Sequence, residues 1–171
     1  RAMGVNFVPD GIVGKTISYE QLHEMGFDGI FVGSGAGLPR FMNIPGENAI
    51  GVMSSNEYLT RINLMGAGRG QGFDTPVLKG KNVVVCGGGN TAMDSARTAK
   101  RMGAETVTLV YRRGLDELPA RAEEVHHAME EGIDFHVLHN PIEYIADENG
   151  RVKEAVLQVM ELGEPDASGR R

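Results

Sequence analysis

A short glycine-rich segment carries the residue types and the spacing that suit nucleotide binding. It directly follows the apolar run Val83–Cys86 and reads Gly-Gly-Gly-Asn-Thr-Ala. Glycine, glycine and alanine at its first, third and sixth positions form the alanine-ended version of the G-x-G-x-x-G fingerprint. Gly87 permits a tight turn, Gly89 leaves the backbone open to a pyrophosphate, and Ala92 lets the next helix approach the sheet. We therefore predict a dinucleotide-binding turn at Gly87–Ala92.

Two adjacent arginines stand where the second strand of such a fold is expected to end. An NAD-binding domain places an aspartate or glutamate there to hold the ribose hydroxyls, whereas this chain has Arg112 and Arg113. Guanidinium groups bind a 2′-phosphate through charge-assisted hydrogen bonds, so the pair predicts NADPH, with NADH possible. The other interpretation of the pair is a solvated strand end. Arg121, expected about a turn and a half into the next helix, would add positive charge to the same phosphate site.

The residues around this segment predict alternating strands and helices. Asn82–Cys86 is a run of mostly β-branched residues, typical of a strand buried on both faces. Pro119 suits the first position of a helix, and Gly103 and Gly132 suit helix ends. Right-handed crossovers would place the three strands in one parallel sheet. The expected order is a strand at 82–86, a helix at 91–102, a strand at 106–111, a helix at 119–131 and a strand at 133–138.

An antiparallel excursion is expected after this parallel core. Apolar segments at 142–147 and 152–160 flank Asn149-Gly150, and Asn-Gly between two apolar runs is a strong hairpin signal. The fold class that follows is α/β, with a Rossmann-like, three-layer domain that carries an antiparallel β excursion.

Further elements are predicted upstream. Ser18 and Gln21 form the pattern of a capping box at the start of a short helix. Phe27–Val32 predicts a buried strand. Ser54–Met65 predicts another helix, with its first residue and Glu57 as a second capping box.

Composition and charge exclude several classes of protein. The 171 residues include 17 basic and 23 acidic side chains, and the net charge of −6 is a poor match for a nucleic-acid backbone. The longest strictly apolar run, Val83–Cys86, is too short to span a bilayer. A single cysteine excludes a disulfide framework, a cysteine-rich zinc site and an iron–sulfur cluster held by this chain alone.

The sequence identifies no catalytic nucleophile, general base or metal ligand. His136 and His139 would point to opposite faces of the expected strand, and Cys86 is expected to be a small core residue. The lack of acid–base machinery fits a reaction whose chemistry belongs to cofactors, such as hydride transfer from a nicotinamide to a flavin. A solvated helix face is expected for Glu123, Glu124, Glu130 and Glu131.

Residues Val84–Ala99, with the motifs Val110–Arg113 and Leu118–Glu124, closely resemble the glutamate synthase small (beta) subunit family. That group of flavoproteins includes ferredoxin:NADP oxidoreductase large subunits and the amino-terminal part of dihydropyrimidine dehydrogenase. Phe31–Arg40 and Ile44–Glu47 resemble the stretch where the chain of this family passes the FAD and leaves the flavin domain.

The resemblance implies an NAD(P)H-binding domain inserted into an FAD-binding domain, as in glutathione-reductase-like flavoproteins. Residues 1–48 would be a fragment of the FAD-binding domain and the crossover, and residues 49–171 the NAD(P)H-binding domain. Against the family pattern, the first FAD fingerprint would lie upstream of Arg1, and the closing FAD segment beyond Arg171. By the same pattern, the third strand of the excursion and the strand that returns to the sheet would also lie beyond Arg171. Truncation at both ends is therefore expected.

By the same resemblance, electrons would pass between NAD(P)H and FAD and then to iron–sulfur centres outside this chain. The partner would be a glutamate synthase large subunit or a ferredoxin-type electron carrier in the cytoplasm, and the fragment alone is expected to be inactive. The residues expected near FAD are Gly33, Gly35 and Ala36. Those expected to contact NADPH are Gly88, Gly89, Asn90, Thr91, Arg112, Arg113 and Arg121.

Two alternatives stay open. One is a ferredoxin:NADP oxidoreductase-type subunit, because these residues do not determine the final electron acceptor. The other is a non-catalytic dinucleotide-binding or scaffolding module, against which the flavin-domain segment Gly33–Glu47 argues. A Rossmann methyltransferase is disfavoured, because its ligand requires an acidic residue where Arg112 stands.

Overall fold

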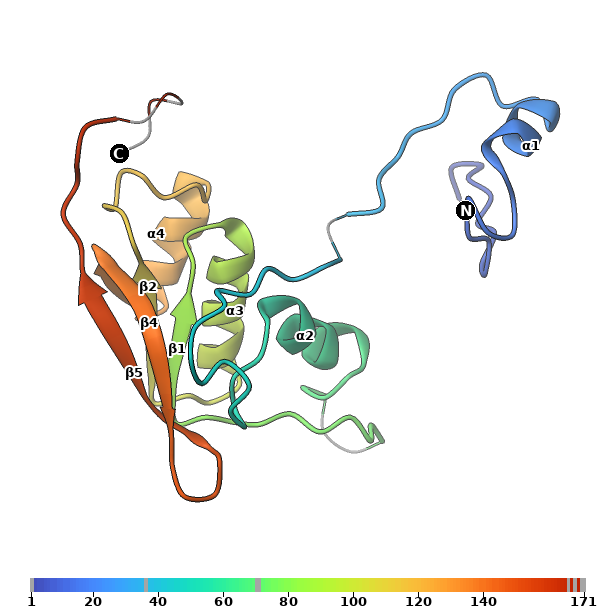
Figure 1. Ribbon diagram of the computed structural model, residues 1–171. Helices are drawn as coiled ribbons and strands as arrows, with labels where there is room; N and C mark the ends of the chain where they lie inside the picture. The colour runs from blue at the N-terminus through green and yellow to red at the C-terminus, as the bar shows by residue number, and fades with distance from the viewer. Residues whose placement is uncertain (1, 36, 70–71, 166, 168, 170–171) are drawn as a thin grey trace. The chain divides into compact units, whose positions relative to one another are not determined.

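A computed structural model describes residues 2–35, 37–69, 72–165, 167 and 169 of the chain (Figure 1). Two compact units divide the chain, residues 1–36 and residues 37–171. The first unit contains helix α1 (Tyr19–Glu24). The second contains, in chain order, α2 (Ser55–Leu59), the π-helical turn η1 (Thr60–Leu64), β1 (Asn82–Cys86), α3 (Asn90–Arg101), β2 (Thr106–Tyr111), α4 (Ala122–Glu130), β3 (Asp134–Val137), β4 (His139–Ala146) and β5 (Val152–Val159).

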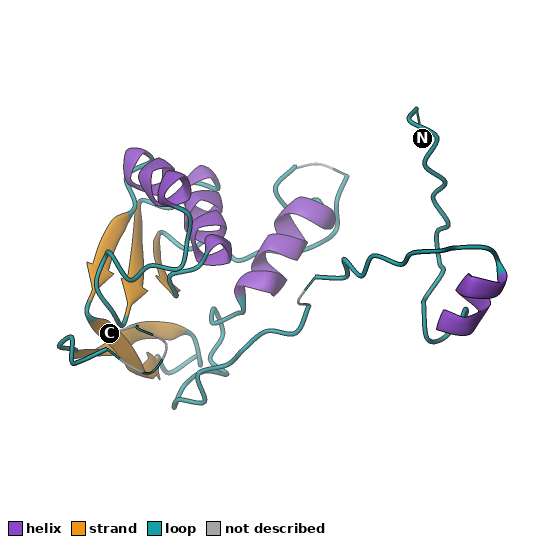
Figure 2. Cartoon of the chain, turned by 90° about the horizontal axis from the view of Figure 1, so that it is seen from above, coloured by secondary structure: helices purple, strands orange, loops and turns teal. Residues whose placement is uncertain are grey.

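The second unit has three layers. Strands β1, β2 and β3 form the predicted parallel sheet in that order, with Val84 opposite Thr108 and Leu109 opposite Phe135. Helices α3 and α4 cover one face of this sheet, and the antiparallel hairpin β4–β5 lies against the other face (Figure 1, Figure 2). The predicted α/β architecture with an antiparallel excursion is therefore confirmed.

The core of this unit lies between the sheet and α3. Met93 and Ala96 of the helix and Leu109 of β2 are fully buried. Small side chains on α3 allow the helix to approach the sheet closely. Strand β1 is less buried than predicted, because its residue Val84 is 48% exposed. Within the described residues, β1 pairs with β2 alone, so its other edge lacks a neighbouring strand.

Ion pairs join α3 to α4. Arg97 donates from Nη1 to Glu124 Oε2 at 2.7 Å and from Nε to Glu131 Oε1 at 2.9 Å. Arg101 also binds Glu131, and this hydrogen bond is the largest cause that lowers the pKa of that carboxyl below its usual value. The prediction of a solvated acidic face is therefore wrong for Glu124 and Glu131, because both acids hold the helix to its neighbour.

Helix α4 begins later than predicted. Pro119 was expected at its first position, but the helix starts at Ala122 with Arg121 as its N-cap residue. The backbone N–H groups of Ala120 and Arg121 donate instead to Gly88 and Asn90 of the glycine-rich turn. These bonds hold the residues before Ala122 outside the helical conformation.

The hairpin forms as predicted but begins earlier. Leu138 has φ +57°, which turns the chain between β3 and β4, so β4 starts at His139. Pro141 lies within β4, which is tolerated because the strand belongs to a two-stranded ribbon. At the hairpin turn, the carboxylate of Asp147 accepts hydrogen bonds from the backbone N–H groups of Asn149 and Arg151.

Both predicted capping residues are found at helix starts. In the first unit, Ser18 and Gln21 form the full capping box of α1. Ser54 accepts from the backbone N–H of Glu57, as predicted, but the Glu57 carboxylate binds Arg61 rather than completing the box. The helical segment then widens into η1 before it ends.

The predicted buried strand at Phe27–Val32 is wrong. These residues have no strand conformation, and the side chains of Phe31 and Val32 are 94% and 80% exposed. A strand requires a neighbouring backbone with which to form its hydrogen bonds. Among the described residues of the first unit, this segment forms no β-bridge, and Phe27 bonds only to the carbonyl of Leu22 in α1.

Replacing Arg97 by methionine should lower the free energy of unfolding, because it removes two hydrogen bonds between charged groups. We expect a loss of roughly 1–3 kcal/mol, measured by urea denaturation followed by circular dichroism. The control is Lys81→Met, which removes the exposed Lys81–Glu105 pair and should cost less than about 1 kcal/mol. Equal losses in the two variants would contradict a special role for Arg97.

Candidate dinucleotide-binding site

The glycine-rich turn leaves the sheet at the carboxyl end of β1. The N–H of Gly87 donates to the carbonyl of Val110 in β2 at 2.9 Å, which keeps the start of the turn on the sheet. Gly87 has φ +142°, a conformation that residues with side chains rarely adopt. The chain then enters α3, with Gly89 as the N-cap residue and Ala92 buried against the core.

The second and third glycines face very different surroundings. A Cβ atom on Gly88 would lie 2.7 Å from the ring of Tyr111 and 2.8 Å from Leu118. A Cβ atom on Gly89 would have no heavy atom within 4 Å beyond its chain neighbours. Gly88 is therefore required for packing within the domain, a role that sequence reasoning missed. Gly89 instead borders open space, as a backbone that receives a pyrophosphate must.

The N-terminus of α3 opens onto that same space. No side chain caps the helix, because its N-cap residue is a glycine. Asn90 and Thr91 in its first turn are exposed. The first N–H groups of a helix have no intrahelical acceptor, and the helix dipole adds positive potential there. An anionic phosphate suits such an end without further adaptation.

The segment 112–121, here called the arginine loop, contains all three arginines predicted to bind NADPH. Tyr111, the last residue of β2, donates from Oη to the carbonyl of Glu117 at 3.0 Å, which holds the middle of the loop against the end of the strand. The N–H of Ala120 donates to the carbonyl of Gly88 at 3.1 Å. This second hydrogen bond joins the arginine loop to the glycine-rich turn.

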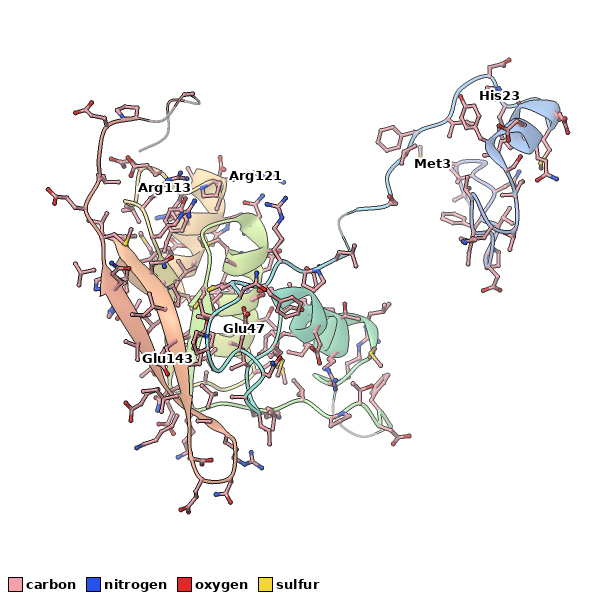
Figure 3. The ribbon with its side chains drawn as sticks, viewed as in Figure 1. Met3, His23, Glu47, Arg113, Arg121 and Glu143 are labelled. Atoms are coloured by element: carbon pink, nitrogen blue, oxygen red, sulfur yellow. The ribbon has the colours of Figure 1, made fainter. Side chains whose placement is uncertain are left out.

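The structure brings the three arginines to the same end of the domain as the turn. Arg112 and Arg113 directly follow β2, and Arg112 is exposed whereas Arg113 is half-buried. Arg121 is exposed at the start of α4, rather than inside the helix as expected. Figure 3 shows Arg113 and Arg121 where α4 begins, near the carboxyl ends of the strands. A parallel α/β sheet commonly binds its ligand at this edge.

The residues expected near FAD belong to the other unit. Gly33 and Gly35 are exposed, and Gly35 has φ +71°, which favours glycine. Ala36, the third residue of that prediction, lies outside the described residues.

No cluster of three or more metal-ligating side chains occurs among the residues that the structure describes. One expectation about the histidines is wrong: the rings of His136 and His139 lie 5.8 Å apart between centroids. The strand ends at Val137, and the positive φ of Leu138 turns the second ring toward the first. The alternation that would separate them applies only within a continuous strand.

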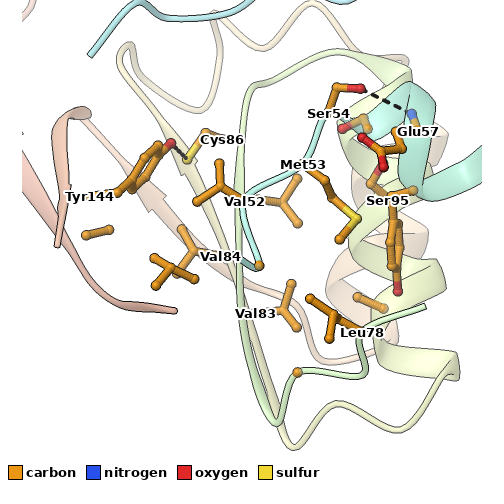
Figure 4. Close-up of a pocket in the computed structure, with 18 of the residues that line it drawn as sticks. Val52, Met53, Ser54, Glu57, Leu78, Val83, Val84, Cys86, Ser95 and Tyr144 are labelled. Atoms are coloured by element: carbon orange, nitrogen blue, oxygen red, sulfur yellow. Dashed lines mark hydrogen bonds between the residues drawn. The ribbon is translucent and has the colours of Figure 1, made fainter. Parts of the chain in front are cut away.

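A cavity of about 850 Å³ lies beside the open edge of β1 (Figure 4). Cys86, at the end of this strand, places Sγ 3.4 Å from Tyr144 Oη of β4. Burial raises the pKa of the Cys86 thiol and also that of the Tyr144 phenol. Cys86 is therefore a neutral thiol in the cavity wall, in a partly open position rather than in the closed core that was expected.

The profile of a protein family described as "Pyridine nucleotide-disulphide oxidoreductase" matches residues 6–166. The chain is 42% identical over 172 residues to the NADPH-Fe(3+) oxidoreductase subunit beta of Geobacter sulfurreducens, covering 99% of this chain and 24% of that protein. It is 36% identical to the glutamate synthase [NADPH] small chain of Escherichia coli, covering 99% of this chain and 36% of that protein. The resemblance to glutamate synthase small subunits is thereby confirmed.

A solved structure shares the fold. FprA of Mycobacterium tuberculosis, determined in complex with NADPH, matches with a TM-score of 0.68 at 22% identity. The match covers 93% of this chain and 48% of FprA. This chain thus spans less than half the length of each of these three proteins. In the part of the chain that the structure describes, no helix is long and apolar enough to cross a membrane.

Adding one methyl group at Gly88 should destabilise the domain, because the new atom would press on Tyr111 and Leu118. We expect Gly88→Ala to lower the free energy of unfolding by about 1–3 kcal/mol, as overpacked cores do. Gly89→Ala is the control without a packing clash, since its methyl group would enter open space and φ there is −88°, so it should lose only the smaller N-cap preference for glycine over alanine. Thermal and urea denaturation of both variants measure the difference, and similar stabilities would contradict the packing role.

The raised pKa of Cys86 predicts slow alkylation and a loss of stability in alkali. The thiolate is the reactive form, so iodoacetamide should modify the folded chain more slowly than the urea-unfolded chain. The thiol of Cys86 ionises at lower pH in the unfolded chain than in the folded chain. Its contribution to the free energy of unfolding is therefore complete at low pH and declines as the pH rises above about 8.5. Urea denaturation between pH 7 and 10 should show a shallower decline in Cys86→Ala. An unchanged decline would contradict this assignment.

Proposed function

Because the chain belongs to the pyridine nucleotide-disulphide oxidoreductase family, we propose that it is the NADPH-binding part of a flavin-dependent oxidoreductase subunit. Residues 49–171 would form the NAD(P)H-binding domain, and residues 1–48 would belong to an FAD-binding domain and the crossover. The observation that carries the proposal is the open space at Gly89, beside an uncapped helix N-terminus and the arginine loop.

The pyrophosphate of NADPH would bind at Gly87–Ala92. The turn of Gly87 and the missing side chain of Gly89 leave the backbone accessible. The free N–H groups at the start of α3, in Asn90 and Thr91, would then donate to the phosphate oxygens. This part of the site does not distinguish NADPH from NADH, because both ligands contain the pyrophosphate.

The 2′-phosphate would bind the arginine loop. Exposed Arg112, together with Arg113 and Arg121, supplies guanidinium groups at the same end of the domain. A guanidinium fork matches phosphate geometry and remains protonated at all physiological pH values. Where an NAD-binding domain has an acidic residue that binds the ribose hydroxyls of NADH, this chain has Arg112.

Bound NADPH would supply a hydride, and the residues of this chain would bind and orient the nucleotide. No described side chain is required as an acid or base, which agrees with chemistry carried by cofactors. We propose that Gly33 and Gly35 contact FAD, supported by their exposure and by the positive φ of Gly35. Ala36 is included in that proposal on the sequence pattern alone.

The onward path of electrons is proposed from the relatives. Both curated relatives are named as subunits of NADPH-linked enzymes, one acting with Fe(3+) and one in glutamate synthesis. We propose transfer to iron–sulfur centres outside this chain, with a glutamate synthase large subunit or a ferredoxin-type carrier as partner. A cytoplasmic location is part of the proposal, supported by the single cysteine.

Isothermal titration with NADPH and NADH tests the nucleotide preference. One arginine that binds the 2′-phosphate should give about a 10- to 100-fold preference for NADPH. Arg112→Ala should therefore lose much of the preference while NADH affinity stays nearly unchanged. Arg151→Ala, at the hairpin turn between β4 and β5, is the matched control and should change neither affinity.

Three outcomes would count against the proposal. A chain that binds neither nucleotide has no such site. Equal weakening of NADH and NADPH in Arg112→Ala would leave the arginines as a solvated strand end. Tight binding without any reduction of flavin in the complete protein would favour the non-catalytic binding module.

A further inference from the structure

Asn90 lies in the first turn of α3, but its side chain contacts the arginine loop. Its Oδ1 atom accepts a hydrogen bond of 2.9 Å from the backbone N–H of Arg121. Arg121 is the N-cap residue of α4, and its own side chain makes no capping hydrogen bond. The Asn90 amide therefore holds the start of α4 from a different element of the fold.

We infer that Asn90 is a positioning residue for nucleotide selectivity, acting through Arg121. It holds Arg121 at the N-terminus of α3, so that the guanidinium group stays close to the glycine-rich turn. The inference rests on the proposed function, because it assumes that the arginine loop binds the 2′-phosphate of NADPH. Sequence motifs assign Asn90 to direct nucleotide contact, and the inferred role is different.

The other contacts of this region do not replace the Asn90 bond. Ala120 donates to the Gly88 carbonyl, one residue before Arg121. The ion pairs of Arg97 hold α4 by Glu124 in its first turn and by Glu131 at its C-terminal end, and neither pair involves Arg121. The bond from Asn90 is made to the N–H of Arg121 itself, so its loss would leave Arg121 held only by the helical bonds to its carbonyl while the helix remains docked.

A double-mutant cycle separates this role from direct contact. The four proteins are the unchanged chain, Asn90→Ala, Arg121→Ala and the double variant, each titrated with NADPH and NADH. We expect Asn90→Ala to reduce the NADPH:NADH preference by roughly three- to tenfold. The double variant should lose no more preference than Arg121→Ala alone, because without the Arg121 guanidinium group the position of its backbone no longer affects the 2′-phosphate.

Two further variants serve as controls. Asn90→Asp keeps an oxygen that can accept from Arg121, so the preference should be retained, although its charge should weaken both nucleotides alike. Asn82→Ala removes another amide acceptor, the partner of Thr106 Oγ1 at 2.7 Å, at the opposite end of β1. It should leave the preference unchanged. If Asn90→Ala does not fold, Asn90→Ser gives the same test, because its hydroxyl is too short to reach Arg121.

The outcomes separate this inference from the proposed function. If the unchanged chain has no preference for NADPH, the proposed function fails and this inference fails with it. If the preference exists and Arg121→Ala reduces it, but Asn90→Ala weakens both nucleotides equally, Asn90 contacts the nucleotide directly and only this inference is overturned. Losses that multiply in the double variant would likewise show that the two residues act independently, and would overturn it.

Discussion

The site depends on the contact between a glycine without a side chain and an aromatic ring. Tyr111 and Leu118 lie so close to Gly88 that even a methyl group would overlap them. This contact allows the arginine loop to lie directly against the glycine-rich turn, where backbone hydrogen bonds can form between the two. The glycine-rich turn and the arginine loop therefore form one packed structure, although about twenty residues separate them in the chain.

Charge is arranged along α4 in a way that supports this packing. The acidic residues Glu124 and Glu131 face Arg97 on α3, and these ion pairs hold the two helices together. Arg121 precedes the acidic part of the helix and remains exposed. The chain has a net charge of −6, but Glu124 and Glu131 in this region are neutralised by Arg97 and Arg101 of α3.

The segment 42–47, which precedes α2 in the chain, contacts the β4–β5 hairpin. Glu47 accepts hydrogen bonds from the backbone N–H groups of Met42 and Asn43, at 2.6 and 2.9 Å. Tyr144 of β4 donates its backbone N–H to Pro45, and a Cβ atom on Gly46 would overlap the Tyr144 carbonyl. The hairpin therefore has a structural partner in a segment almost one hundred residues earlier in the chain. The same hairpin contributes Tyr144 to the wall of the cavity beside β1.

The sequence by itself determined the parallel βαβαβ order, the hairpin, the glycine-rich turn and the three arginines. These features depend on local patterns: β-branched runs, helix-ending glycines and the Asn149-Gly150 turn. Only the tertiary structure decided which glycine is needed for packing, where α4 starts and what the Asn90 side chain contacts. Each of these depends on atoms from elements far apart in the chain, and local spacing carries no information about such contacts. Phe27–Val32 shows the same limit, because apolar β-branched residues form a strand only where another backbone can pair with them.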